Sequence, residues 1–135
     1  MKEQKSILII EDSTTVLKMI KKYFEMAGYL VQACASTEEA YKILNNAKID
    51  LVICDIVIES KTAQTGYHIL KYVKKSSDLK HIPVFLMTDR RNTANASATA
   101  LRLGACAFLE KPFKMEELEE MVKKSLSDPS FVHNK

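Results

Sequence analysis

Short unbroken apolar runs recur along the chain, and between them apolar residues return every three or four positions. The run at 51–55, Leu-Val-Ile-Cys-Asp, is apolar until its last residue, which is a carboxylate. An unbroken run of this length is typical of a strand that is buried on both faces, as in a parallel sheet. Similar runs predict further strands around residues 6–10, 30–33, 84–88 and 105–110.

The stretches between these runs follow the 3.6-residue period of amphipathic helices. Ser13 can cap the first helix and Gly28 can close it. The sequence Ser36-Thr37-Glu38-Glu39 has the form of a capping box, and Gly104 stops an alanine-rich helix. The predicted helices cover residues 14–27, 37–46, 67–73, 93–103 and 115–126.

Strands that alternate with helices require a parallel sheet with helices on both faces. We therefore predict an α/β fold, a doubly wound five-stranded parallel sheet flanked by five helices. Residues 1–127 would form this single domain, and residues 128–135 would form a C-terminal tail that we expect to be frayed. A length of 135 residues suits one domain with a real core.

Composition excludes some classes of function. Apolar residues make up 47% of the chain and charged residues 27%, as in an ordinary soluble globular protein. The net charge of +3, from 20 basic and 17 acidic residues, is too small to indicate nucleic acid. No stretch approaches the roughly 18 apolar residues of a membrane span, and no signal-peptide region precedes the first strand. We expect neither a nucleic-acid nor a membrane partner.

The chain has three cysteines, Cys34, Cys54 and Cys106, in apolar or small-residue settings and without C-x-x-C spacing. Buried free thiols in a reducing compartment explain them better than disulfides or a metal site. We therefore expect a cytoplasmic protein.

Chemistry-bearing side chains stand at the ends of four predicted strands. Glu11 and Asp12 follow the first, Asp55 ends the central one, Thr88 ends the fourth, and Lys111 comes shortly after the fifth. Open α/β sheets bind ligands just beyond the carboxyl ends of their strands. If the strands are parallel neighbours, three acids, a hydroxyl and an ammonium converge on that edge.

This arrangement resembles the receiver domain of two-component response regulators, from about Ser6 to Leu126. The acidic pair, the strand-end aspartate, the strand-end hydroxyl and the sequence Lys111-Pro112-Phe113 occur in the family's order and at its element ends. Each motif alone is weak, but together they are specific. The resemblance implies a flavodoxin-like sheet of strand order 2-1-3-4-5, with the site at the switch between the first and third strands.

The resemblance also implies roles. Asp55 would be the phosphoacceptor and would form a mixed anhydride. Glu11, Asp12 and Asp55, with the backbone carbonyl of Val57, would hold Mg²⁺ or Mn²⁺. Without a cation the three carboxylates would repel one another and raise a pKa, whereas a hard divalent ion relieves that conflict. Lys111 would face Asp55 and later the phosphoryl group.

A conformational switch is implied in the same way. Thr88 would donate its hydroxyl to a phosphoryl oxygen and shift inward, and Phe108 would change rotamer with it. A plain core aromatic would look the same in sequence, so both interpretations of Phe108 stay open. A cis peptide bond between Lys111 and Pro112 would aim the ammonium at the site.

Two features depart from the family pattern. Asp89 stands where the family has a small residue, and it could act as a gatekeeper against incoming phosphate or pair in solvent with Arg90 or Arg91. Glu59 replaces a usual proline, and the loop 56–65 is a few residues longer than usual. That loop could shape partner choice or be a tolerated insertion.

We therefore expect a stand-alone response regulator receiver that takes a phosphoryl group on Asp55 from a histidine kinase or a phosphotransfer protein. Its output would be the docking of another protein on the face made by the alanine-rich helix, the fifth strand and the last helix. We expect no enzyme activity beyond self-catalysed phosphorylation and autodephosphorylation. The alternative is a degenerate receiver that binds proteins without being phosphorylated.

Overall fold

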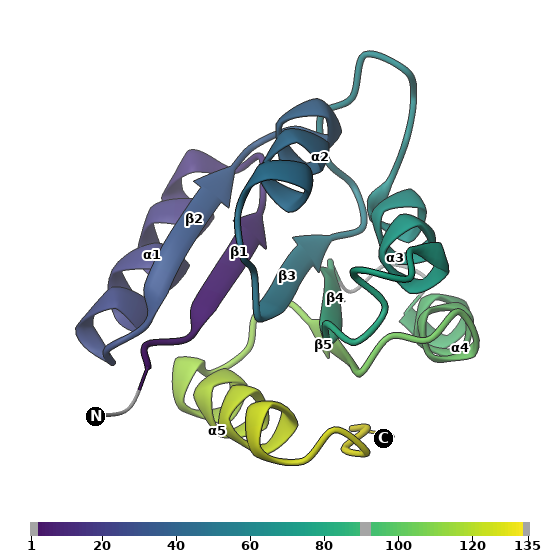
Figure 1. The fold of residues 1–135 in the computed structure, drawn as a ribbon. Coiled ribbons are helices and arrows are strands. Elements are labelled where there is room, and N and C mark those ends of the chain that lie inside the picture. The colour runs from purple at the N-terminus through teal and green to yellow at the C-terminus, as the bar shows by residue number, and fades with distance from the viewer. Residues whose placement is uncertain (1–2, 90–92, 134–135) are drawn as a thin grey trace.

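A computed structural model describes residues 3–89 and 93–133 of the chain (Figure 1). Within these residues every predicted strand and helix is present, with ends that differ by a few positions from those predicted. The elements are β1 Ser6–Ile10, α1 Thr14–Met26, β2 Leu30–Cys34, α2 Thr37–Asn46, β3 Leu51–Asp55, α3 Gly66–Lys75, β4 Val84–Thr88, α4 Thr93–Arg102, β5 Ala107–Glu110 and α5 Met115–Ser127.

The strands form one parallel sheet of order β2-β1-β3-β4-β5. This confirms the doubly wound α/β fold and its strand order. Helices α2, α3 and α4 cover one face of the sheet, and α1 and α5 cover the other (Figure 1). Along β1, Leu8 and Ile10 pack on the first face, whereas Ile7 and Ile9 pack on the second. Burial on both faces is the reason why these strands are unbroken apolar runs.

The helix ends follow the local signals in the sequence. Ser13 caps α1 by accepting a hydrogen bond from the backbone N–H of Val16, and Ser36 caps α2 in the same way from Glu39. Gly28 follows α1 with a φ of 99°, a left-handed conformation that favours glycine. The caps mark where each helix begins or ends, and the parallel pairing of the strands places their carboxyl ends at a common edge.

The C-terminal tail differs from the prediction. Phe131 packs against the core on the α1 and α5 face, and its carbonyl accepts a hydrogen bond from the Cys106 thiol at 3.0 Å. The backbone N–H of His133 donates to the Cys106 carbonyl at 2.8 Å. Residues 128–133 are therefore held against the start of β5 and are not frayed, because an aromatic anchor offsets the entropy of ordering the tail.

The three cysteines are buried and unpaired with one another, as expected. Burial raises the pKa of the Cys34 thiol to about 12 and that of Cys106 to about 11, so both are protonated at neutral pH. No helix in the described part of the chain is both long and apolar enough to cross a membrane.

Candidate functional site

Two buried carboxylates meet at the carboxyl edge of the sheet. Glu11 directly follows β1 and Asp55 ends β3, and these neighbouring parallel strands pair Ile10 with Cys54. The two acids are only 1% and 6% exposed. Lys111, which follows β5, reaches across and forms ion pairs with both, with its ammonium 2.5 Å from Oε1 of Glu11 and in contact with Oδ2 of Asp55. Strand order therefore brings together residues that are far apart in the sequence.

The position of Lys111 is fixed by its backbone. Its N–H donates to the carbonyl of Thr88 at 2.8 Å, and the following Lys111–Pro112 peptide bond is cis. Burial lowers the pKa of Lys111, but hydrogen bonds from the ammonium to Asp55 and Glu11, and their charges, more than offset that effect. The net pKa lies above the ordinary value, so the ammonium stays charged at neutral pH.

Asp12 stands apart from this ion-paired group. It is exposed, and loss of solvent around its carboxylate, together with the charge and hydrogen bond of Glu11, raises its pKa. Loss of solvent is the larger cause, and the contribution of Glu11 is the repulsion between carboxylates that the sequence predicts. Ser13, and not Asp12, supplies the helix cap, so capping does not explain the acid at position 12.

The donor set suits a hard cation bound through few protein ligands. In the part of the chain that the structure describes, no three His, Cys, Asp or Glu side chains form a ready-made metal cluster. Mg²⁺ usually binds through one or two carboxylates and keeps several waters, so it does not need such a cluster. Glu11 and Asp55 share the single ammonium of Lys111, and the neighbouring Asp12 adds a third carboxylate that has no ion pair of its own among the described residues. The residues present therefore fit a divalent cation.

Asp55 is held on both of its oxygens. Oδ1 accepts a hydrogen bond from the backbone N–H of Val57 at 3.0 Å, while Oδ2 takes the ion pair with Lys111. The Val57 side chain is 69% exposed, so the residue that binds Asp55 through its N–H lies at the protein surface. The carboxylate is thus oriented before any phosphate donor arrives.

Thr88 and Phe108 lie on the neighbouring strands. Thr88 ends β4 and is 9% exposed, one position beyond the residue that pairs with Asp55. Phe108, in β5, is half-buried against the core on the α2, α3 and α4 face. The structure places Thr88 at the edge that carries the acids, and Phe108 two pairs back from it along the same strands.

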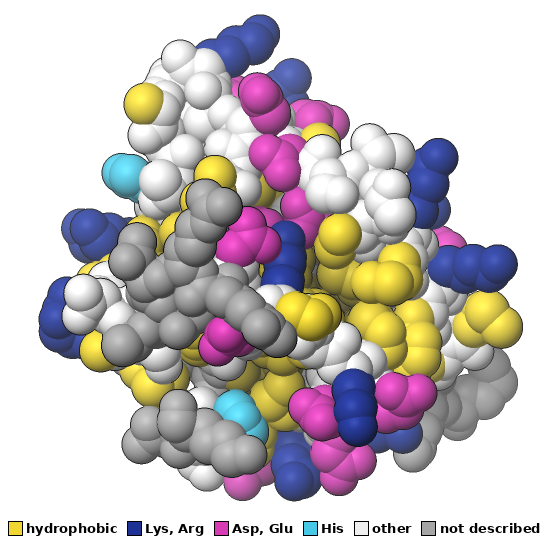
Figure 2. All heavy atoms as spheres, turned by 180° about the vertical axis from the view of Figure 1, so that it is seen from behind, with side chains coloured by type: hydrophobic (Ala, Val, Ile, Leu, Met, Phe, Trp, Pro, Cys, Tyr) yellow, Lys and Arg dark blue, Asp and Glu magenta, His cyan; other side chains and the backbone are white. Residues whose placement is uncertain are grey.

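Asp89 is exposed and lies in a groove beside Lys111. The groove has a volume of about 330 Å³, and its other walls come from α1 and from the segment after β5, namely Val16, Met19, Pro112 and Phe113. Figure 2 shows hydrophobic side chains gathered on the α1 side of the molecule, next to acidic and basic ones. Arg90 and Arg91, the expected partners of Asp89, lie outside the described residues.

Hydrogen bonds hold the loop 56–65 against the start of α2. The carboxylate of Glu38 in α2 accepts hydrogen bonds from the hydroxyl of Ser60 at 3.2 Å and from the backbone N–H of Lys61 at 3.2 Å. The backbone N–H of Thr37 donates to the carbonyl of Glu59 at 3.0 Å. The loop is therefore fastened to the start of α2. The sequence gives little indication of this, because residues 59–65 of the loop are polar apart from Ala63.

Gly66 is a residue of the site that sequence reasoning missed. It opens α3, and its N–H donates to the Ile56 carbonyl at 2.8 Å. A Cβ at this position would lie 2.4 Å from the carbonyl oxygen of Asp55 and 2.9 Å from the Cα of Ile56. A glycine directly after the long loop is the signal that the sequence offers for this position, because it lets two backbones come close behind Asp55.

Comparison with known proteins shows the family of the chain. The family described as "Response regulator receiver domain" matches residues 7–123. The chain belongs to that family. It is thus the receiver domain of a two-component response regulator, and receiver domains generally bind Mg²⁺ at their phosphorylation site.

Similar proteins span several kinds of organism. A probable transcriptional regulator of Cyanidium caldarium, ycf27, is 31% identical over 125 residues, which cover 93% of this chain and 47% of that protein. The transcriptional regulatory protein YvrH of Bacillus subtilis (strain 168) is 30% identical over 125 residues, 92% of this chain and 50% of that protein. This receiver domain thus spans about half the length of the curated relatives it matches.

Solved structures agree with the fold. A putative response regulator from Chloroflexus aurantiacus J-10-fl superimposes with a TM-score of 0.83 at 31% identity, covering 93% of this chain and 100% of that one. The signal receiver domain of a signal transduction histidine kinase from Syntrophus aciditrophicus has a TM-score of 0.81 at 32% identity, covering 91% and 90%.

Proposed function

We propose that this receiver domain accepts a phosphoryl group on Asp55 from a histidine kinase or a phosphotransfer protein. The observation that carries the proposal is the orientation of a buried carboxylate between the ammonium of Lys111 and the N–H of Val57. One oxygen of Asp55 would form a new P–O bond while the bond from phosphorus to the donor breaks, and the donor would leave with the bonding electrons. The product is an acyl phosphate.

Lys111 and the acidic residues would have different electrostatic roles. Lys111 would turn from the carboxylate toward the phosphoryl oxygens and offset their charge. Glu11, Asp12, Asp55 and the backbone carbonyl of Val57 would hold Mg²⁺ or Mn²⁺, Glu11 from its buried position. When bound, this ion neutralises charge on the transferring phosphoryl group.

The switch is proposed at the end of β4. Thr88 would bind a phosphoryl oxygen, and the resulting shift of β4 against β5 would reach Phe108, which is only half-buried. The face formed by α4, β5 and α5 would then bind a downstream protein. The three buried thiols support a cytoplasmic location.

The two curated relatives are named as a probable transcriptional regulator and a transcriptional regulatory protein, and this chain spans about half of their length. The expectation that no nucleic acid binds therefore concerns residues 1–135 alone. Regulation of transcription by a longer protein that contains this receiver is compatible with the proposal.

Intact-mass spectrometry of the wild-type chain tests the proposal. After incubation with Mg²⁺ and a small donor such as acetyl phosphate, we expect a gain of one phosphoryl group that is lost on treatment with hydroxylamine, as an acyl phosphate is. Incubation with a chelator is the control and should give no gain. If no donor and none of a range of histidine kinases adds mass, the degenerate receiver is the better interpretation.

Replacing Asp12 with alanine should slow Mg²⁺-dependent phosphorylation severely. Loss of one carboxylate ligand should weaken Mg²⁺ binding by about 10- to 100-fold or more. The free energy of unfolding should hardly change, because Asp12 is exposed and repelled by Glu11. Ser13→Ala is the matched control, since losing the cap costs about 0.5–2 kcal/mol of stability but no ligand. Normal phosphorylation of Asp12→Ala would remove Asp12 from the metal site.

Asp89→Ala separates the two roles considered for that residue. Because Asp89 is exposed, its charge is screened, and we expect the phosphorylation rate with a small donor to change by less than about fivefold. Rates should be measured at low and high salt. A gatekeeper would instead give a faster variant, with the larger gain at low ionic strength, and that result would contradict the expectation.

A further inference from the structure

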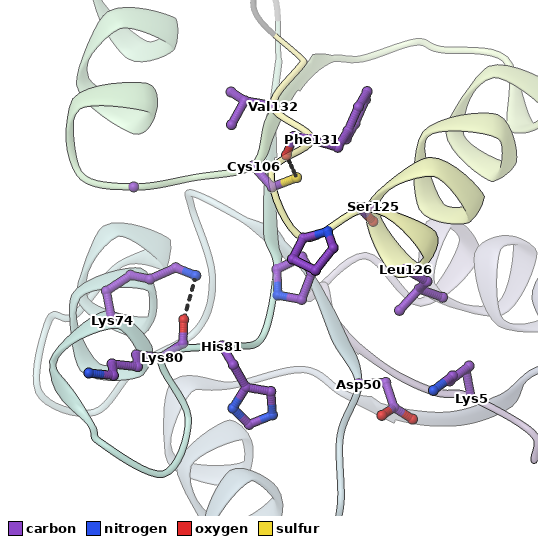
Figure 3. A pocket seen from close by; sticks show the side chains of 13 residues that line it. Lys5, Asp50, Lys74, Lys80, His81, Cys106, Ser125, Leu126, Phe131 and Val132 are labelled. Carbon is purple, nitrogen blue, oxygen red and sulfur yellow. Dashed lines mark hydrogen bonds between the residues drawn. The ribbon is translucent and has the colours of Figure 1, made fainter.

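A cavity of about 390 Å³ lies at the edge of the sheet opposite to Asp55 (Figure 3). Residues just before β1, β3 and β4 line it, as do the end of α3 and the last turn of α5. The docked tail closes it, with Pro129, Phe131 and Val132 in the wall. The volume falls within the range of small-molecule sites, about 300–1,000 Å³.

Lys74, in the last turn of α3, brings a half-buried charge to this cavity. Its ammonium donates to the carbonyls of Lys80 at 3.1 Å and Ile82 at 2.8 Å, and Figure 3 shows its side chain extending toward the cavity. Burial lowers the pKa of Lys74. Among the residues that the structure describes, no carboxylate forms an ion pair with it. An ammonium has three protons, so a ligand could accept the third.

The lining as a whole is basic. Lys5, Lys74 and Lys80 carry three positive charges against one carboxylate, Asp50, which leaves an excess of two, and His81 adds a further donor. Oδ2 of Asp50 is already engaged by the backbone N–H of Ser6 at 2.8 Å. Lys80 is exposed and its ammonium points away in Figure 3, but its four-carbon stem can turn toward a bound anion.

The opposite wall is apolar. Leu126 is half-buried, Phe131 is half-buried, and Val132 is 54% exposed although it lines the cavity. We propose that this cavity binds a small phosphate monoester with a planar or apolar body, the phosphate at Lys74 and the body against Phe131 and Val132. The excess of two positive charges matches a dianionic monoester. The site is independent of phosphorylation on Asp55.

Binding to the full chain tests this site. Adenosine monophosphate and phenyl phosphate serve as probes, and inorganic phosphate, which lacks the body, serves as the comparison. Titration calorimetry without Mg²⁺ should show binding of at least one monoester, with inorganic phosphate weaker by about tenfold or more. In NMR spectra, the amide signals of Lys74, its neighbours and residues 130–132 should shift on addition of the monoester. Shifts confined to the region of Asp55, or no binding of either monoester at millimolar concentration, would overturn the proposal.

Two variants give the test its controls. Lys74→Met should weaken binding of the monoester by about tenfold or more, whereas Lys71→Met, an exposed lysine on the same helix that does not line the cavity, should bind like the wild type. If Lys74→Met fails to fold, Val132→Asp takes its place, because it sets a carboxylate in the wall at an exposed position. Wild-type affinity of Lys74→Met, or of Val132→Asp where it is used instead, would refute the site.

Discussion

Replacing Asp55 with asparagine is expected to abolish formation of the acyl phosphate. The amide has no carboxylate oxygen that can attack phosphorus and form the mixed anhydride, so the rate should fall below about one hundredth of the wild-type rate. The loss should occur with small donors and with a kinase, because both would need the same nucleophile. Intact-mass spectrometry before and after hydroxylamine measures it directly.

The Asp55→Asn variant should stay folded. Lys111 would keep its ion pair with Glu11 at 2.5 Å, so its half-buried ammonium would not be left without a counter-charge. The amide is nearly the same size as the carboxylate and can still accept the hydrogen bond from Val57. Asp78→Asn is the matched control, because Asp78 is an exposed loop aspartate far from this cluster in the sequence. A labile mass gain that survives Asp55→Asn would assign the nucleophile to another residue.

Much of this fold could be predicted because local and tertiary requirements coincide. The strands β3 and β4 are buried along their whole length, and such burial produces the unbroken apolar runs from which they are predicted. The caps at Ser13 and Ser36 act within four residues, so the sequence contains all that they need. The convergence of Glu11, Asp55 and Lys111 then follows from parallel strands and a common edge.

What could not be predicted depends on contacts between distant backbone segments. The tail is short and has only Phe131 and Val132 as large apolar residues, and only the folded sheet provides the Cys106 backbone and thiol that bind it. The loop 56–65 similarly gains its order from Glu38, which is about twenty residues away in the sequence. Polar loop residues show no periodicity, so nothing in the pattern distinguishes a fastened loop from a free one.

The different environments of Glu11 and Asp12 could not be predicted from the sequence, for a related reason. Glu11 and Asp12 are adjacent, and the sequence treats them as equivalent acids. In the structure the first is buried and paired with Lys111, whereas the second is exposed and has a raised pKa. The direction of the chain as it leaves β1 decides this difference, and a pattern of residue types does not contain it.

Gly66→Ala is expected to damage both stability and phosphorylation. The new methyl group would meet the Asp55 carbonyl oxygen at 2.4 Å and the Ile56 Cα at 2.9 Å, and backbone atoms at the end of a central strand cannot move cheaply. Overpacking of this kind costs typically about 1–3 kcal/mol. Relief of the contact has to displace α3 or the backbone of Asp55, and a shift of about 1 Å in a reacting group can cost roughly 100-fold in rate.

The matched control is Gly28→Ala, which separates the loss of stability from the loss of site geometry. Gly28 has open space within 4 Å of the added Cβ, but its φ of +99° strains any residue with a side chain, at a cost of about 1–2 kcal/mol. It lies far from the acids, at the end of α1, so the folded fraction of this variant should phosphorylate at the wild-type rate. Urea unfolding gives the folded fraction, and mass spectrometry with acetyl phosphate gives the rate. If the two variants phosphorylate equally at equal folded fraction, Gly66 matters for stability alone. A selective defect in Gly66→Ala would show that the close approach of α3 to the end of β3 positions Asp55 for phosphorylation.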